Sequence, residues 1–195
     1  MNSHQLQIEQ QIKDSSTTIS ACHEQSELIA QISSLVIAAF RNGHKLFLFG
    51  NGGSASDAEH IATELSGRFK LERPSLPALS LTANTSTLTA IANDYGFEML
   101  FSRQLEGLAN TGDVVIGIST SGNSPNVING LKFAKSIGAT TIAMTGKSGG
   151  KLIEFADYCL CIPSDDTPRI QEAHILIGHI LCDLVEKDLF ESKQE

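Results

Sequence analysis

The chain has 195 residues, a formal net charge of −8 and a pI near 5.2. This length fits a single domain, which we expect to span residues 1–195, with N-terminal helices at 1–41 and an α/β core at 44–195. The acidic balance, without any long Lys/Arg cluster, argues against direct binding to nucleic acid or to an anionic membrane. The polar N-terminal segment lacks a signal-peptide core, so the sequence predicts a soluble, cytoplasmic protein.

The cysteines suggest neither a zinc finger nor a secreted disulfide scaffold. They lack Cys-x-x-Cys spacing and are few for the length of the chain. We therefore expect four buried free thiols, at Cys22, Cys159, Cys161 and Cys182.

Apolar residues recur at helical spacing before residue 41 and predict two helices, the second ended by Asn42 and Gly43. The first helix has only about four large apolar residues in twenty. It cannot bury much against its own domain, so we expect it to pack on another subunit.

The first chemical motif is a strand, a glycine turn and a helix over residues 45–64. Leu46–Phe49 is apolar throughout, as expected of a parallel strand buried on both faces, and Gly50–Gly53 suits a tight turn. Ser54 is the expected N-cap of the helix, with Asp57 at the third position of a capping box. The arrangement is typical of an anion site, although glycine turns of this kind are common and no dinucleotide or triphosphate signature is present.

His60 and Glu64 lie four residues apart and therefore project from one face of this helix. The spacing suits a pair of metal ligands, or an imidazole and a carboxylate that share acid/base work. A solvated surface pair is the alternative interpretation.

The next segment contains a short strand at 78–81 and then a stretch rich in hydroxyl and amide side chains. Leu88 with Ile91 predicts one short helix there. Asn93 and Asp94 are expected to cap a following helix at 96–107. Asp94 either serves only as this cap or contacts a sugar hydroxyl.

The strongest ligand signal follows a buried strand at 113–118. Hydroxyl residues are concentrated in the next loop, and Pro125 begins a helix directly after it. Hydroxyl groups and free backbone amides at a helix N-terminus are typical of a phosphate site, and four hydroxyls exceed what one cap needs. The four hydroxyl residues are Ser119, Thr120, Ser121 and Ser124, and we refer to residues 119–124 as the serine loop.

Two more strands, at 140–144 and 158–162, bring the total to five. Strands separated by helices predict an α/β fold, with a five-stranded parallel sheet flanked by helices in three layers. Ligands of such sheets gather at the carboxyl ends of the strands, where both the glycine turn and the serine loop lie.

The last helix is expected to start with Thr167 as its N-cap and to bury Ile170, Ala173, Ile177, Leu181 and Leu184. Gln171 and His179 share another face of this helix. With His60 and Glu64 they would supply the nitrogen and oxygen donors that a zinc-type ion accepts. Single polar residues on a helix face are more commonly solvated or packed.

Several separated motifs closely resemble the phosphoheptose isomerase family of the sugar isomerase (SIS) superfamily. The resemblance spans nearly the whole chain and implies a single SIS domain, usually in a homotetramer with active sites at subunit boundaries. It implies an aldose-ketose isomerase that converts D-sedoheptulose 7-phosphate to D-glycero-D-manno-heptose 7-phosphate, the first step toward the heptose of lipopolysaccharide. The motifs are Gly50–Glu64, Ala92–Phe97, Gly117–Pro125 and Arg169–His174.

Residue roles follow from this resemblance by position. Phosphate contacts fall to Ser119, Thr120, Ser121 and Ser124, and sugar contacts to Asn51, Gly52, Gly53, Asn93, Asp94 and Gln171. One zinc ion per site would be held by His60, Glu64, Gln171 and His179. Glu64 and His179 would also form the acid/base pair, with Glu64 as the carbon base.

Two other functions remain open at this point. A relative in the same superfamily is a non-catalytic adaptor that binds the bacterial replication initiator, and the segments 72–77 and 88–94 resemble it. A pure adaptor has no need of a complete acid/base and metal set, which favours an enzyme. The substrate could also be another phosphosugar, because nothing in the sequence counts its carbons.

Gln171 and His179 are eight residues apart, about 12 Å along a helix axis. They could reach one metal ion only by leaning toward each other. We therefore expect a neighbouring chain to complete the site and the protein to be an oligomer, most simply a homotetramer.

Overall fold

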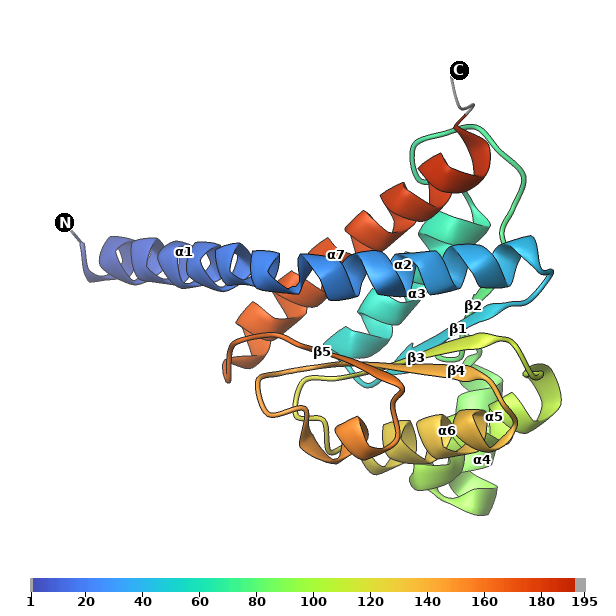
Figure 1. The fold of residues 1–195 in the computed structure, drawn as a ribbon. Coiled ribbons are helices and arrows are strands. Elements are labelled where there is room, and N and C mark those ends of the chain that lie inside the picture. Colours follow the sequence, from blue (N-terminus) through green and yellow to red (C-terminus); the bar gives the residue numbers. More distant parts are fainter. Residues whose placement is uncertain (1, 192–195) are drawn as a thin grey trace.

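A central parallel sheet organises the chain in the computed structural model, which describes residues 2–191. The strand order is β2-β1-β3-β4-β5, and every neighbouring pair is parallel. This confirms the predicted five-stranded α/β sheet (Figure 1). The strands are β1 (Leu46–Gly50), β2 (Ala78–Ser80), β3 (Val114–Ser119), β4 (Thr140–Thr145) and β5 (Tyr158–Cys161).

Helices cover both faces of the sheet and form two separate apolar cores with it. One face carries α2 (Ser26–Arg41), α3 (Gly53–Ser66) and α7 (Thr167–Phe190), with α1 (Ser3–Ala21) and the 3-10 turn η1 (Cys22–Gln25) leading into it. The other face carries α4 (Thr85–Tyr95), η2 (Phe97–Met99), α5 (Leu100–Leu108), α6 (Pro125–Ser136) and η3 (Gly150–Glu154). The three-layer architecture is therefore as predicted.

The first strand shows why its sequence is apolar at every position. Leu46 and Leu48 pack into the core under α2, α3 and α7, whereas Phe47 and Phe49 pack into the core under α5 and α6. All four are fully buried. Each such side chain contributes about 1.5 to 3 kcal/mol by leaving water, so both faces of β1 help to fix the sheet at the point where the glycine turn begins.

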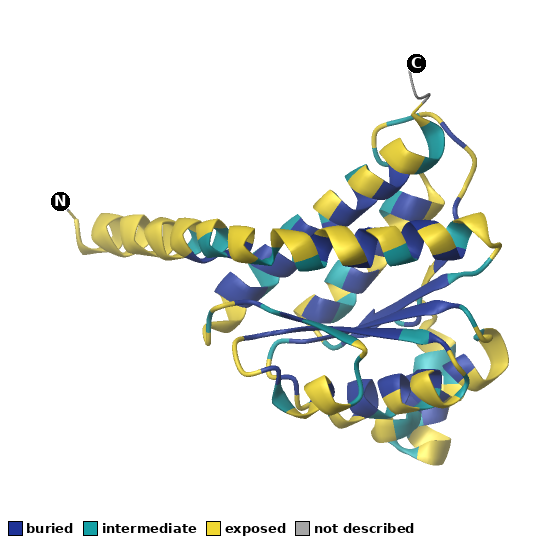
Figure 2. Ribbon diagram, viewed as in Figure 1, coloured by how far each residue is buried: buried dark blue, intermediate teal, exposed yellow. Residues whose placement is uncertain are grey.

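Helix α1 reaches well beyond the sheet, and most of its surface is exposed (Figure 2). Thr18 is the one buried residue of α1, and Leu6, Ile8 and Ile12 are 53%, 58% and 62% exposed. This confirms the expectation that α1 buries little against its own domain. Large apolar side chains held in water are costly, so this helix is suited to packing on a partner.

Three predicted helix caps are wrong. Helix α3 begins at Gly53 after Gly52, whose φ of 57° glycine adopts readily, so Ser54 lies inside the helix and Asp57 caps nothing. Helix α7 has Asp166, not Thr167, at its N-cap position. Asp94 lies in the last turn of α4, and Asn84 caps that helix by accepting from the Thr87 N–H at 3.0 Å.

Two burial predictions also need correction. Cys22 and Cys182 are buried free thiols as expected, but Cys159 and Cys161 are only partly buried because they lie on the edge strand β5. Leu184, expected on the buried face of the last helix, is 38% exposed. Among the helices within residues 2–191, none combines the length and the apolar character needed to cross a membrane.

Candidate active site

The site begins where α3 and α7 approach each other closely. Gly178 of α7 packs directly on Ile61 of α3, and a Cβ atom at position 178 would lie only 2.5 Å from Ile61 Cδ1. Glycine therefore allows the two helices to meet at this level. His60 is adjacent to Ile61 in α3, and His179 is adjacent to Gly178 in α7. The same helix contact therefore brings the two histidines together.

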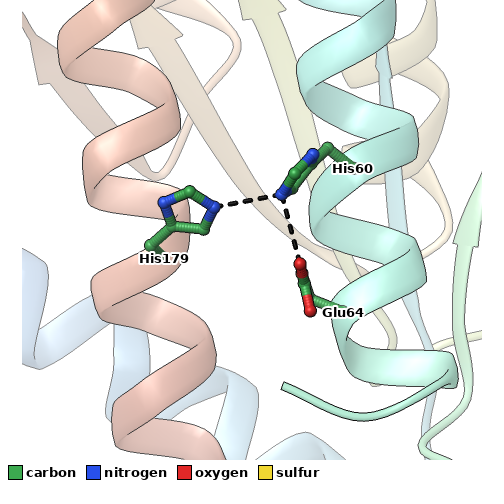
Figure 3. Close-up of side chains that lie close together, drawn as sticks. All are labelled: His60, Glu64 and His179. Carbon is green, nitrogen blue, oxygen red and sulfur yellow. Dashed lines mark hydrogen bonds and ion pairs between the residues drawn. The ribbon is translucent and has the colours of Figure 1, made fainter. Parts of the chain in front are cut away.

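Three polar side chains converge in the space between these two helices (Figure 3). The Nε2 atoms of His179 and His60 are 3.0 Å apart, and His60 Nε2 lies 3.2 Å from Glu64 Oε1. The ligating atoms of all three residues lie within 4.8 Å of one another. We refer to His60, Glu64 and His179 as the trio.

The trio has the donor set of a zinc-type site. Two imidazole nitrogens and a carboxylate oxygen are common zinc ligands, and such atoms lie about 3.3 to 3.6 Å apart around a tetrahedral ion with bonds of about 2.0 to 2.2 Å. The observed separations fit this pattern after small side-chain movements. The His60 side chain is 48% exposed, so solvent or substrate can approach the site.

All three residues of the trio come from one chain. Glu64 and His179 therefore meet without a second chain. The prediction that a neighbouring chain completes the site, which rests on the distance along α7 between Gln171 and His179, stays a prediction. The trio does not depend on that distance, because α3 supplies the other two residues.

Gln171 is placed elsewhere in this conformation. Its amide packs against Gly53, where a Cβ atom would lie 2.8 Å from the Gln171 carbonyl oxygen. Gly53 precedes His60 by seven residues, about 10 Å along α3. Gln171 thus meets the glycine turn, which suits a sugar contact, and its role as a fourth metal ligand stays a prediction.

The ring of Phe69 covers His179, a contact that the sequence did not predict. The rings of Phe69 and His179 stack at a centroid distance of 5.8 Å and an angle of 21°. Phe69 follows α3 in the loop 67–77, which has no periodicity from which this contact could be read. The stack restricts the imidazole and shields one of its faces from water.

A buried ion pair anchors the loop that carries Phe69. Arg73 Nε donates to Glu186 Oε1 at 3.0 Å, and both side chains are nearly fully buried. The same carboxylate accepts the backbone N–H groups of residues 69–71 at 2.7 to 3.1 Å. Arg73 also donates to the Glu64 carbonyl oxygen at 2.8 Å, so this pair ties the loop to the trio's own helix. Helical spacing puts Glu186 about 160° around α7 from Ile170, away from the predicted apolar face, so the sequence carried no signal for this pair.

Another carboxylate near the trio is Asp57, one turn before His60 on α3. Burial raises its pKa to about 6, although the charge of His60 opposes this shift. Its Oδ2 atom is buried without a hydrogen-bond partner. The site therefore contains an acid that titrates near neutral pH.

The serine loop lies beside the glycine turn, as predicted, because β1 and β3 are neighbours with Gly50 opposite Ile118. Ser119 Oγ lies 2.9 Å from Ser124 Oγ and 3.4 Å from Ser121 Oγ at the N-terminus of α6. Clustered hydroxyls at the start of a helix suit an anion. Thr120 and Ser121 also line a pocket with the cationic Lys147.

A pair of amides joins the two loops. Asn51 Nδ2 donates to Asn126 Oδ1 at 2.9 Å, and Asn126 Nδ2 donates back to Asn51 Oδ1 at 2.8 Å. Asn51 was predicted to contact the sugar, and in this conformation its side chain holds the glycine turn against α6. Gly52 and Gly53 remain exposed at the mouth of the site.

Asn93 and Asp94 are not close to the trio within this chain. Both are exposed on α4, which covers the opposite face of the sheet from α3 and α7, and they bond to each other at 2.7 Å. Their contact with the sugar stays a prediction.

Comparison with known proteins places this geometry in a family context. The family model described as SIS domain matches residues 10–146. The phosphoheptose isomerase of Sulfurimonas denitrificans is 54% identical over 186 residues, covering 94% of this chain and 95% of the relative. Solved phosphoheptose isomerase structures from Neisseria gonorrhoeae and Francisella tularensis superpose with TM-scores of 0.90 and 0.91, at 40% and 36% identity. They cover 95% and 96% of this chain and 100% of each solved chain.

Proposed function

Because the chain belongs to the phosphoheptose isomerase family of SIS-domain proteins, we propose that it interconverts D-sedoheptulose 7-phosphate and D-glycero-D-manno-heptose 7-phosphate. The protein is an aldose-ketose isomerase, and this reaction is the first step toward the heptose of lipopolysaccharide. The observation that supports the proposal most directly is the trio, which combines a carboxylate and two imidazoles at one crossing of α3 and α7.

The chemistry requires one proton to leave C1 of the ketose and one to arrive at C2. Glu64 accepts the C1 proton, the electron pair forms the C1–C2 double bond of an enediol, and the C2 oxygen gains a proton. Return of a proton to C2 and loss of the O1 proton then give the aldose. His179 moves the protons at the two oxygens, a task for which a side chain must reach within about 3 Å of the sugar.

His60, Glu64 and His179 would hold a zinc-type ion, and Gln171 would have to move from Gly53 to serve as a fourth donor. When bound, such an ion stabilises negative charge that develops on the substrate oxygens. Glu64 would be less basic as a metal ligand, so its role as the carbon base requires a carboxylate oxygen that is free of the ion. The stack of Phe69 on His179 keeps this imidazole oriented toward His60 and Glu64.

The phosphate end of the sugar would be bound by the serine loop. Ser119, Thr120, Ser121 and Ser124 offer hydroxyl donors beside the N-terminus of α6, whose dipole favours an anion. A Cβ atom on Gly52 would meet no atom within 4 Å, so the glycine turn is open there, whereas Gly53 is packed against Gln171. The substrate thus extends from the serine loop toward the α3–α7 crossing.

Assembly into a homotetramer is part of the proposal. Helix α1 leaves Leu6, Ile8 and Ile12 more than half exposed, which favours a partner along it. Asn93 and Asp94 would reach the sugar of a neighbouring subunit, because they lie on the face of the sheet opposite the trio of their own chain.

The decisive assay is incubation with sedoheptulose 7-phosphate, followed by NMR of the products with and without added Zn²⁺. We expect conversion to the heptose aldose, and a loss of rate after the metal is removed by a chelator. No conversion in either condition would favour the adaptor function, whereas conversion of a shorter ketose phosphate alone would favour another phosphosugar.

A further inference from the structure

A pair of thiols lies apart from the site described above. Cys159 and Cys161 alternate with buried Leu160 on β5, so both side chains leave the same face of the strand. Their sulfur atoms are 3.5 Å apart, and both residues are partly accessible. Cys159 packs with the core under α5 and α6, whereas the trio lies on the α3–α7 face of the sheet.

The backbone disfavours a disulfide between these two residues. Residues i and i+2 of a strand are about 6.6 Å apart, and their Cβ atoms keep nearly that separation. A disulfide needs Cβ atoms about 3.5 to 4.5 Å apart, so β5 would have to buckle. The two sulfurs instead share a hydrogen bond at 3.5 Å, without a covalent bond.

This separation matches a chelating pair. Two thiolates bonded to a tetrahedral ion at about 2.3 Å lie about 3.8 Å from each other. The sulfurs therefore need to move only a few tenths of an ångström. Partial exposure on an edge strand leaves water free to supply the remaining ligands. We propose that Cys159 and Cys161 form a second cation site, selective for a thiophilic divalent ion of the zinc or cadmium type.

A hydroxyl group also borders the two sulfurs. The Thr145 hydroxyl lies 3.4 Å from Cys161 Sγ, so a thiolate there has a donor before any cation arrives.

The two cysteines lie close to the segment 146–150, which in turn contacts the serine loop. A Cβ atom on Gly149 would lie 3.4 Å from Cys161 Sγ, so the segment 146–150 borders the sulfurs. A Cβ atom on Gly122 of the serine loop would in turn lie 2.6 Å from the Gly149 carbonyl carbon. The proposed cation would therefore lie one segment away from the serine loop and separate from the trio.

The test is titration of the full-length, chelator-treated protein with Cd²⁺ in a non-thiol reductant, following the cadmium–thiolate absorption band in the ultraviolet. Cations bound by the imidazoles and carboxylate of the trio give no such band. We expect a final band intensity that corresponds to one thiolate-bound Cd²⁺ per chain, reached after one or two equivalents because the trio also takes up Cd²⁺. Cys159→Ser and Cys161→Ser should each weaken this binding by at least about tenfold, the low end of the loss seen even for outer-shell changes.

The buried thiols supply the matched control. A protein carrying Cys22→Ala and Cys182→Ala should keep the band and its affinity, provided that circular dichroism shows it folded. Absence of the band in the wild-type protein would overturn the proposal. Persistence of the band in a Cys159→Ser/Cys161→Ser protein would also overturn it, and so would full affinity in either single serine variant, because a chelate needs both sulfurs.

Discussion

Gly178 lies against Ile61, and this contact sets the distance between the helices that carry His179 and His60. Gly178→Ala would place a Cβ atom 2.5 Å from Ile61 Cδ1 and push α7 away from α3. We expect a loss of about 1 to 3 kcal/mol in the free energy of unfolding, as is usual for overpacking. Zn²⁺ affinity, measured by calorimetry, should fall as well.

A second substitution tests the cause. Ile61→Ala removes the atoms that the new methyl group would strike, so Ile61→Ala/Gly178→Ala should regain Zn²⁺ affinity relative to Gly178→Ala alone. If the double variant binds Zn²⁺ no better than the single one, helix spacing is not what Gly178 provides.

Phe69 should affect turnover more than binding. Phe69→Leu keeps an apolar side chain but loses the stack on His179, worth about 0.5 to 1.5 kcal/mol, so kcat should fall about two- to tenfold with KM little changed. Phe69→Tyr retains the ring and serves as the control. Steady-state kinetics in which Leu and Tyr behave alike would show that stacking is irrelevant.

Glu186 should be the most sensitive charged residue for stability. Glu186→Gln breaks a buried pair with Arg73 and weakens the acceptor for the backbone N–H groups of 69–71, at a cost of about 3 to 5 kcal/mol. Asp183→Asn is the matched control three residues earlier. Its partners are exposed lysines, and we expect a change of about 1 kcal/mol or less in urea denaturation.

The effect of Glu186 should depend on pH with a defined sign. Burial would raise the pKa of Glu186, but the hydrogen bonds from residues 69–71 and Arg73 outweigh it and lower the pKa below its usual value. Stability from this group is therefore fully present above the unfolded pKa of about 4.3 and is lost as pH falls through the lower folded pKa. The difference between wild type and Glu186→Gln should shrink only in that acidic range. A constant difference down to pH 2 would contradict this origin.

Ser121 is the most exposed hydroxyl residue of the serine loop and should contribute to phosphate binding. Ser121→Ala should raise KM by the equivalent of about 1 to 3 kcal/mol with kcat nearly unchanged. Ser136→Ala, at the exposed far end of α6, should leave both constants unchanged. Loss of kcat at constant KM would instead place Ser121 in the chemistry.

Much of the fold could be predicted from sequence, because its signals are local. Apolar runs such as Leu46–Phe49 identify buried parallel strands, and alternation with helices fixes the sheet class. The pairing of His60 with Glu64 follows from helical spacing alone, and the position of the serine loop follows from its place after β3.

The remaining features depend on contacts between distant segments. The crossing of α3 and α7 at Gly178 cannot be derived from either helix alone, so His179 could not be placed beside His60 within one chain. The start of α3 depends on the φ value of Gly52, which sequence does not give, and Ser54 was the more typical N-cap residue. Phe69 and the Arg73–Glu186 pair belong to a loop without periodicity, where sequence patterns carry little information.

We propose that Glu64 transfers the proton between C1 and C2 of a ketose phosphate. The direct measurement is NMR of sedoheptulose 7-phosphate in deuterated buffer with Zn²⁺, comparing the wild-type protein with Glu64→Gln and recording the metal content of each. We predict conversion by the wild type. Glu64→Gln should lose both conversion and deuterium exchange at C1 by at least about a hundredfold, the low end expected for a general base. Conversion by Glu64→Gln at the wild-type rate would contradict the account.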